Sequence, residues 1–212
     1  MHDDFLQHRW PQFEAVRRCW ADGDLDRSAE LIDAALAHDP DDPGVLLVSA
    51  FQLLEEAWVH GWARADEIRA MVARATALAA DDAHAHVGAA LALVQLGDVE
   101  GAGKHAAAAE THGDELSEGS VRAALAYVHG RVLVARGHPG LAEPHLRAAA
   151  EHCAEEDEFA ASWIEALRVL GRREEADGAL RAALRRHPRS ARLLALERDG
   201  TQVTFTTRRR RA

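Results

Sequence analysis

The chain has 212 residues, of which only 5% are aromatic, and alanine, leucine and charged residues dominate its composition. Alanine is the best helix former and the β-branched residues typical of strands are sparse, so an all-α fold is predicted. With Arg208–Arg211 set aside, 21 basic residues stand against 35 acidic ones, a net charge of −14 that argues against nucleic-acid binding by the body of the protein.

The N-terminal segment and the cysteines favour a reducing compartment. Residues 1–4 are acidic overall and lack the apolar core of a signal peptide. No apolar run approaches the length that a bilayer-spanning helix needs. Cys19 and Cys153 form no CxxC pair and have no metal-finger spacing. We therefore expect a cytoplasmic protein that does not enter a membrane.

Four glycines recur along the chain at related intervals: Gly23, Gly97, Gly137 and Gly171. Each follows an amphipathic stretch of about a dozen residues and precedes another, as a glycine that ends a helix does. The last interval is 34 residues, the one before it is 40 and the first is 74. A single period of 34 residues explains all four positions if two insertions of six residues are allowed.

The residues around these glycines keep the same register. A small residue stands five positions after each glycine and an alanine seven positions later, which gives Ser28, Ala102, Ala142 and Ala176, then Ala35, Ala109, Ala149 and Ala183. Small side chains at these places let paired helices pack closely. Pro40 and Pro188 follow five positions later in two of the four cases, where proline prevents the second helix from continuing.

The segments GDLDRSAELIDAALAHDPDD, LVQLGDVEGAGKHAAAAE and LRVLGRREEADGALRAALRRHP are similar to the tetratricopeptide repeat. The 34 residues of that repeat form a helix, a tight turn and a second, antiparallel helix. The resemblance implies a right-handed α-solenoid of about five helix pairs with a polar-faced capping helix at its C-terminal end. This helical-repeat domain would span residues 1–198.

In chain order, the five pairs are expected at about residues 9–42, 43–82, 83–116, 117–156 and 157–190, with the cap at 191–198. The second pair lacks the glycine and carries one of the six-residue insertions within WVHGWARAD. The other falls within GDELSEGS, between the third and fourth pairs. Pro144 falls in the second helix of the fourth pair, which we expect it to kink or delay. Residues 199–212 predict a basic, disordered tail that could instead dock in an acidic groove.

The first helix of each pair lines the concave face in the tetratricopeptide family, and the resemblance therefore implies where a partner binds. The expected partner-binding residues are Leu47, Phe51, Leu54, Trp58, His84, Val87, Leu91, Tyr127, Arg131, Glu165 and Arg168. This face would be apolar in its N-terminal half and charged in its C-terminal half, suited to an amphipathic helix or an extended peptide with an apolar anchor. Val87 and Leu91 replace the lysine and asparagine of carboxylate-clamping members, so no such clamp is expected.

Thirteen histidines raise the question of a metal site. Two ligands on one helix must be three or four residues apart to reach one ion, and no two histidines have that spacing. Ligands could still converge between helices, for example His105, His129 and His145. A lone histidine on an apolar helix is more often a satisfied core residue, and we expect no metal and no cofactor.

The resemblance implies a scaffold or adaptor that binds a protein or peptide partner and is not an enzyme. Two alternatives stay open. The first is an enzyme or a small-molecule- or metal-binding protein that uses His129, Tyr127, Arg131 and Glu165 on inner helices of the third to fifth pairs. The second is a solenoid that assembles with copies of itself. Bound metal or ligand in the purified protein would favour the first, and concentration-dependent association the second.

Overall fold

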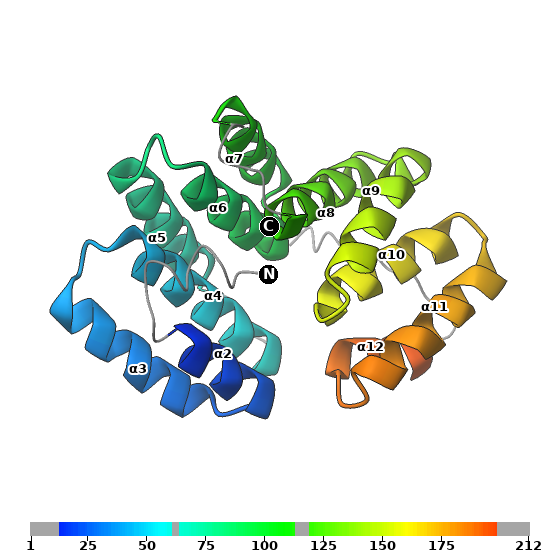
Figure 1. The fold of residues 1–212 in the computed structure, drawn as a ribbon, viewed down its shortest axis with the longest axis horizontal. Coiled ribbons are helices and arrows are strands. Elements are labelled where there is room, and N and C mark those ends of the chain that lie inside the picture. The colour runs from blue at the N-terminus through cyan, green and yellow to red at the C-terminus, as the bar shows by residue number, and fades with distance from the viewer. Residues whose placement is uncertain (1–12, 61–63, 113–118, 199–212) are drawn as a thin grey trace, which may run out of the picture. The chain divides into compact units, whose positions relative to one another are not determined.

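The computed structural model describes residues 13–60, 64–112 and 119–198, and every regular element in these ranges is an α-helix (Figure 1). The eleven helices described are α2 (Phe13–Asp22), α3 (Leu25–His38), α4 (Pro43–His60), α5 (Ala65–Leu78), α6 (Ala83–Leu96), α7 (Val99–Thr111), α8 (Gly119–Ala135), α9 (Pro139–His152), α10 (Asp157–Val169), α11 (Arg173–Arg186) and α12 (Ala191–Arg198). The predicted all-α fold is therefore confirmed. The tail at 199–212 lies outside the described residues.

Successive helices pack as the pairs α2/α3, α4/α5, α6/α7, α8/α9 and α10/α11, and α12 packs on α10 and α11. Gly23, Gly97, Gly137 and Gly171 have φ between +76° and +85°, and each lies at or near the turn within a pair. A side chain at such a φ is strained, so the 34-residue period reflects a backbone requirement of the turn. The small residues five positions later are fully buried in all four pairs.

Aspartates begin many of these helices. The side chain of Asp24 accepts a hydrogen bond from the backbone N–H of Arg27, and Asp98 accepts one from Gly101. Asp82 accepts from the N–H groups of both His84 and Ala85. Each carboxylate satisfies N–H groups that have no partner within the helix, and it also lies favourably in the helix dipole. Some of the many acidic residues therefore stabilise helix N-termini.

Of the two effects expected of Pro144, a kink or a delay of its helix, the delay is wrong. α9 begins at Pro139, five residues earlier, and continues to His152 with Pro144 inside it. A proline at the first helical position costs nothing because its missing N–H would have no partner there. Pro144 removes one backbone hydrogen bond in the second turn, which α9 tolerates while its buried face, including Ala142 and Leu146, packs on neighbouring helices.

The chain divides into two compact units, Met1–Ser117 and Glu118–Ala212. The division falls at the predicted insertion GDELSEGS, most of which lies outside the described residues. Unit 1 contains α2–α7 and has a core cluster around Phe13, Val16 and Ile32. Unit 2 contains α8–α12 and has a core cluster that includes Ile164, Leu167 and Leu193. Each unit thus buries a core of its own.

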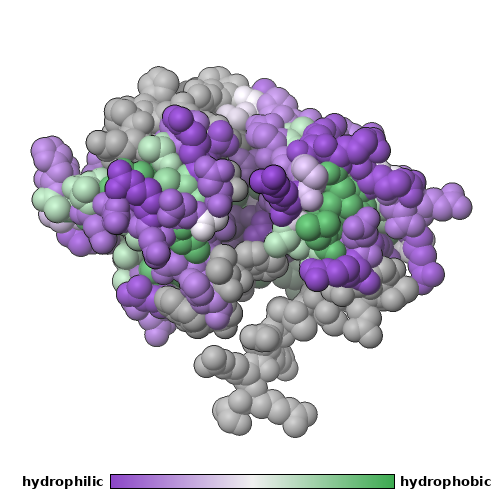
Figure 2. Space-filling model, turned by 90° about the horizontal axis from the view of Figure 1, so that it is seen from below, coloured by the Kyte–Doolittle hydropathy of each residue, from purple (hydrophilic) through white to green (hydrophobic). Residues whose placement is uncertain are grey.

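The described residues expose few large apolar side chains. The face seen in Figure 2 is largely hydrophilic, with smaller apolar patches interrupted by polar side chains. Among the described residues, the exposed large apolar side chains are Leu78, Leu141, Val169 and Leu170. No helix in the described ranges combines the length and apolarity that crossing a bilayer requires.

Candidate partner-binding surface

The predicted binding residues of unit 1 lie on α4 and α6, and most of them are buried. Leu47, Phe51, Val87 and Leu91 are at most 6% exposed. The cause is that both helices are covered on several sides: α4 contacts α3, α5 and α6, and α6 contacts α4, α5 and α7. These side chains therefore form the interior of the unit.

Two of the predicted residues of unit 1 reach its surface. Leu54 of α4 is half-buried, and the His84 side chain on α6 is 22% exposed, with its Nδ1 atom 3.7 Å from a carboxylate oxygen of Asp82. Trp58 lies in α4, but its side chain is outside the described structure. Any partner contact made by the described inner helices of unit 1 must therefore be limited to a few groups.

Unit 2 brings the predicted polar residues together. Tyr127 of α8 is fully buried and stacks on Phe159 of α10, with ring centroids 4.3 Å apart. Its hydroxyl donates a hydrogen bond of 2.6 Å to Glu158, and Arg131 donates to the same hydroxyl at 2.9 Å. Arg131 also donates to the buried hydroxyl of Ser162 at 3.2 Å. These bonds tie α8 to α10, and burial raises the pKa of Tyr127 well above its ordinary value.

The capping helix α12 extends this network. A guanidinium nitrogen of Arg192 lies 3.6 Å from a carboxylate oxygen of Glu158 and 3.7 Å from one of Asp157. Arg168 of α10 donates to the backbone carbonyl of Leu196 in α12 at 2.9 Å. Arg192 was not predicted from the sequence. It lies outside the repeats, so the 34-residue period gives no position for it.

Glu165 is the carboxylate of this region that makes no hydrogen bond or ion pair with any described residue. It lies on α10, half-buried, and burial raises its pKa although Arg131, Arg192 and Arg168 act in the opposite direction. Its neighbour Glu158, by contrast, accepts from Tyr127 and pairs with Arg192. A half-buried carboxylate without a hydrogen-bond donor retains acceptor capacity that a ligand can use.

The histidines are arranged differently from the three-histidine set that the sequence left open as an alternative. His129 and His145 do approach each other, with ring centroids 6.1 Å apart, but His105 pairs with His86 of α6 instead. The two Nδ1 atoms of His86 and His105 are 3.0 Å apart. Within the described residues, no three histidine, cysteine, aspartate or glutamate side chains are placed to hold a metal ion. His105, His129 and His145 therefore do not form the site that sequence alone left open.

The hydrogen bonds of His86 fix its tautomer. Its Nε2 atom is 2.9 Å from the carbonyl oxygen of Ala80, which can only accept, so Nε2 carries the proton. The Nδ1 atom of neutral His86 must then accept from the Nδ1–H group of His105. The ring of His112 is stacked parallel to that of His86 at 6.5 Å between centroids. Burial, followed by the neighbouring His86, lowers the pKa of His105.

No protein-family model matches the sequence, and no curated protein does. Solved structures do match the fold. A tetratricopeptide-repeat protein of Thermus thermophilus, TTC0263, aligns with a TM-score of 0.65 at 21% identity, over 88% of this chain and 95% of that one. PilF of Pseudomonas aeruginosa aligns with a TM-score of 0.56 at 15% identity, over 89% of this chain and 88% of PilF. YrrB, a tetratricopeptide protein described as having an unusual peptide-binding site, aligns with a TM-score of 0.44 at 20% identity. The alignment covers 82% of this chain and 92% of YrrB.

Proposed function

We propose that this chain, which has the α-solenoid fold of tetratricopeptide proteins, is a scaffold that binds a segment of a partner protein on its inner helices. The fold rests on the helix pairs and on the structures that align with them. In unit 2 the polar face of α8, α10 and α12 would supply the contacts. In unit 1, taken by itself, Leu54 and His84 would do so. We also propose that the protein acts in the cytoplasm.

The observation that carries the proposal is that the half-buried carboxylate of Glu165 forms no hydrogen bond or ion pair with any described residue. Its carboxylate lies near three arginines, yet none of them is close enough for an ion pair. A further cation is disfavoured there because Arg131, Arg168 and Arg192 already repel it. Neutral donors avoid that repulsion, and an extended peptide offers backbone N–H groups at regular intervals. We therefore infer that the partner presents backbone or side-chain amide groups to Glu165.

Binding fits this surface better than catalysis. The raised pKa of Tyr127 keeps its hydroxyl protonated, and that hydroxyl is already engaged by Glu158 and Arg131. A catalytic acid or base needs a pKa near the working pH and access to a substrate. Tyr127 meets neither condition, so the inner face is proposed to bind a partner and to do no chemistry.

The test is capture of partners from native cell extract, identified by mass spectrometry, with variants chosen from the structure. Tyr127 is unsuitable because it is part of the core. Glu165→Ala removes the unpaired carboxylate, and Glu174→Ala removes an exposed carboxylate from α11 as the matched control. We expect the wild type and Glu174→Ala to capture the same protein and Glu165→Ala to lose most of it. Equal capture by all three forms would contradict the proposed site.

A further inference from the structure

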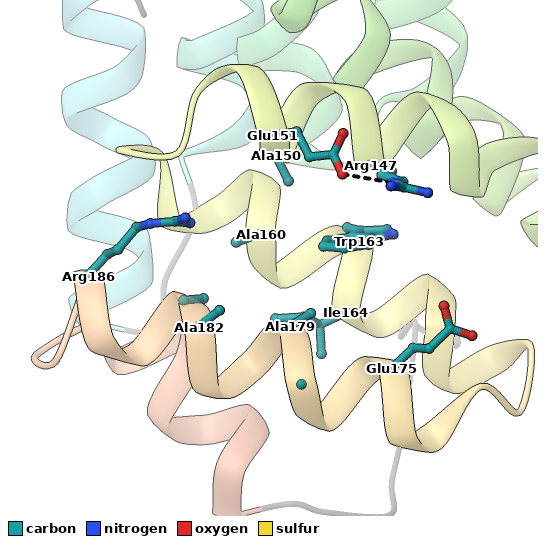
Figure 3. A pocket seen from close by; sticks show the side chains of 12 residues that line it. Arg147, Ala150, Glu151, Ala160, Trp163, Ile164, Glu175, Ala179, Ala182 and Arg186 are labelled. Atoms are coloured by element: carbon teal, nitrogen blue, oxygen red, sulfur yellow. Dashed lines mark hydrogen bonds and ion pairs between the residues drawn. The ribbon is translucent and has the colours of Figure 1, made fainter.

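A second surface of unit 2 is an open groove on the side of α9, α10 and α11 (Figure 3). It has a volume of about 470 Å³, within the range of ligand-binding clefts. Trp163 of α10 lies in its middle, between α9 and α11, and the α11 side includes the small residues Gly178, Ala179 and Ala182. None of the inner-face residues Tyr127, Arg131 or Glu165 lines it.

The tryptophan is held in a fixed position. Its Nε1–H group donates a hydrogen bond of 2.9 Å to Glu143, and Glu143 in turn lies 3.3 Å from a guanidinium nitrogen of Arg172. The polar group of the indole is therefore satisfied, and Trp163 is left half-buried in the groove as an apolar surface. Small residues on α11 leave room beside it for large side chains from another molecule.

The charges at the groove are paired except for one. Arg147 donates to Glu151 at 2.8 Å, and Glu175 accepts two hydrogen bonds from Arg172. Arg186, in the last turn of α11, makes no hydrogen bond or ion pair with any described residue, and it is exposed. The group that would complement the groove is therefore an anion placed beside an apolar side chain.

We propose that this groove docks an amphipathic helix of a partner protein that carries an acidic residue in its first turn, followed by large apolar residues. The acidic residue pairs with Arg186 and the apolar residues lie over Trp163 and the small residues of α11. This inference is independent of the proposed inner-face function, because it uses a different surface.

The helical rise sets the spacing in such a partner. Ala182 is one turn and Ala179 two turns before Arg186, which is about 6 and 10 Å along α11. A helix antiparallel to α11 would thus carry apolar residues about four and seven positions after its acidic residue. The antiparallel direction also places the partner's N-terminus, which is partially positive, near the partially negative C-terminus of α11.

The probe is a fluorescein-labelled peptide of about 16 residues on an alanine-rich helical background. It carries glutamate in the first turn, leucine four residues later and phenylalanine seven residues later; a second peptide has lysine in place of the glutamate. Fluorescence anisotropy with the full chain should give saturable binding of the glutamate peptide with a Kd of about 10–100 μM. No saturation up to about 1 mM would overturn the proposal.

Four variants locate the binding. Ala179→Glu should abolish it by placing a charge in the groove, whereas Glu165→Ala and Gly103→Ala should leave it unchanged. Arg186→Glu should weaken binding of the glutamate peptide about five- to tenfold and improve binding of the lysine peptide. That exchange of preference cannot come from misfolding. Equal binding of both peptides to the wild type, or binding retained by Ala179→Glu, would refute the proposal.

A second copy of the chain is the competing occupant. Sedimentation at several protein concentrations distinguishes it: self-association that Ala179→Glu abolishes, and that the glutamate peptide does not disrupt, would assign the groove to a copy of this chain. The acidic-helix proposal would then be wrong. A monomer at every concentration, together with peptide binding, supports it.

Discussion

The two units of the chain place their charges in opposite ways. Residues 1–117 contain 8 basic and 22 acidic side chains, a net charge of −14, whereas residues 118–212 contain 17 and 13, a net charge of +4. Yet the buried stretches of the inner helices of the acidic unit carry no formally charged side chain: residues 44–53 of α4 and 85–94 of α6 are all buried, and their polar side chains are Ser49, Gln52 and His86. The inner helices of unit 2 instead share the network of Tyr127, Arg131 and Glu158.

Where the charged residues lie along the chain, more than how many there are, therefore decides whether the inner helices of a unit carry charge. In unit 1 many carboxylates are exposed on α3 or serve as caps such as Asp82, and the interior holds mainly apolar side chains with a few hydrogen-bonded polar ones such as Gln52. In unit 2 charged groups lie between helices, where each must find a partner or remain costly. Unit 2 therefore depends on charged groups that are paired between its helices, and four measurements test whether the two units differ in this way.

The largest effect is expected from Tyr127→Ala. It removes a fully buried ring, its stacking on Phe159 and the bonds that satisfy Glu158 and Arg131, so unfolding should become easier by about 3–5 kcal/mol. Denaturant unfolding followed by circular dichroism measures the loss. Hydrogen exchange read by mass spectrometry should show lost protection in residues 119–198. Equal loss in both units would mean that they unfold together.

Helix packing in unit 2 should be sensitive to one glycine. A Cβ at Gly130 in α8 would lie 2.5 Å from the Cγ of Leu146 in α9, so Gly130→Ala should destabilise the protein by about 1–3 kcal/mol. Gly103 of α7 in unit 1 is the matched control. No atom lies near its added Cβ, so Gly103→Ala should stabilise by up to about 1 kcal/mol. Thermal unfolding of both variants tests the difference in sign.

Acidification should act first on unit 1. The folded pKa of His105 lies below the ordinary value of 6.5, so the folded state favours the neutral ring. Its contribution is present above the unfolded pKa and is lost as pH falls from there toward the folded pKa. We therefore expect unit 1 to lose stability as pH falls below about 6.5. His105→Gln should flatten this dependence; an unchanged slope would contradict the assignment.

In unit 2, Glu165 should make the stability fall as pH rises, which is opposite to the effect of His105. We expect this effect to be the smallest of the four. Its folded pKa is raised, so the ionised carboxylate is disfavoured in the fold, and the resulting loss of stability develops as pH rises through the folded pKa. Glu165→Gln should therefore be neutral or stabilising by up to about 1 kcal/mol at pH 7. A clear loss of stability in chemical unfolding would show that the carboxylate has a structural partner after all.

The local features of the fold could be predicted from sequence. Gly23, Gly97, Gly137 and Gly171 were identified because a turn that needs positive φ constrains one residue type at one position. Burial on the inner helices could not be predicted in the same way. α6 has apolar residues on every side, so periodicity does not tell which side chains face solvent, and Val87 and Leu91 proved to be core residues.

The polar network was predicted only in part. The repeat resemblance placed Tyr127, Arg131, Glu165 and Arg168 on one face. The structure brings Tyr127 and Arg131 into contact with each other and with Glu158. The contribution of Arg192 depends on how the cap packs on α10, which no repeat spacing encodes. The groove at Trp163 was also missed, because it is formed by small residues whose pattern resembles ordinary helix packing.

The tautomer of His86 has a consequence for chemical reactivity. Because the Ala80 carbonyl holds the Nε2 proton and His105 donates to Nδ1, neutral His86 has no free lone pair with which to attack an electrophile. His105 keeps a lone pair on Nε2. An acylating reagent such as diethyl pyrocarbonate should therefore modify His105 and spare its neighbour. The Ala80 carbonyl fixes the tautomer of His86 on α6, and as a result His105 on α7 is the ring of the pair that reacts.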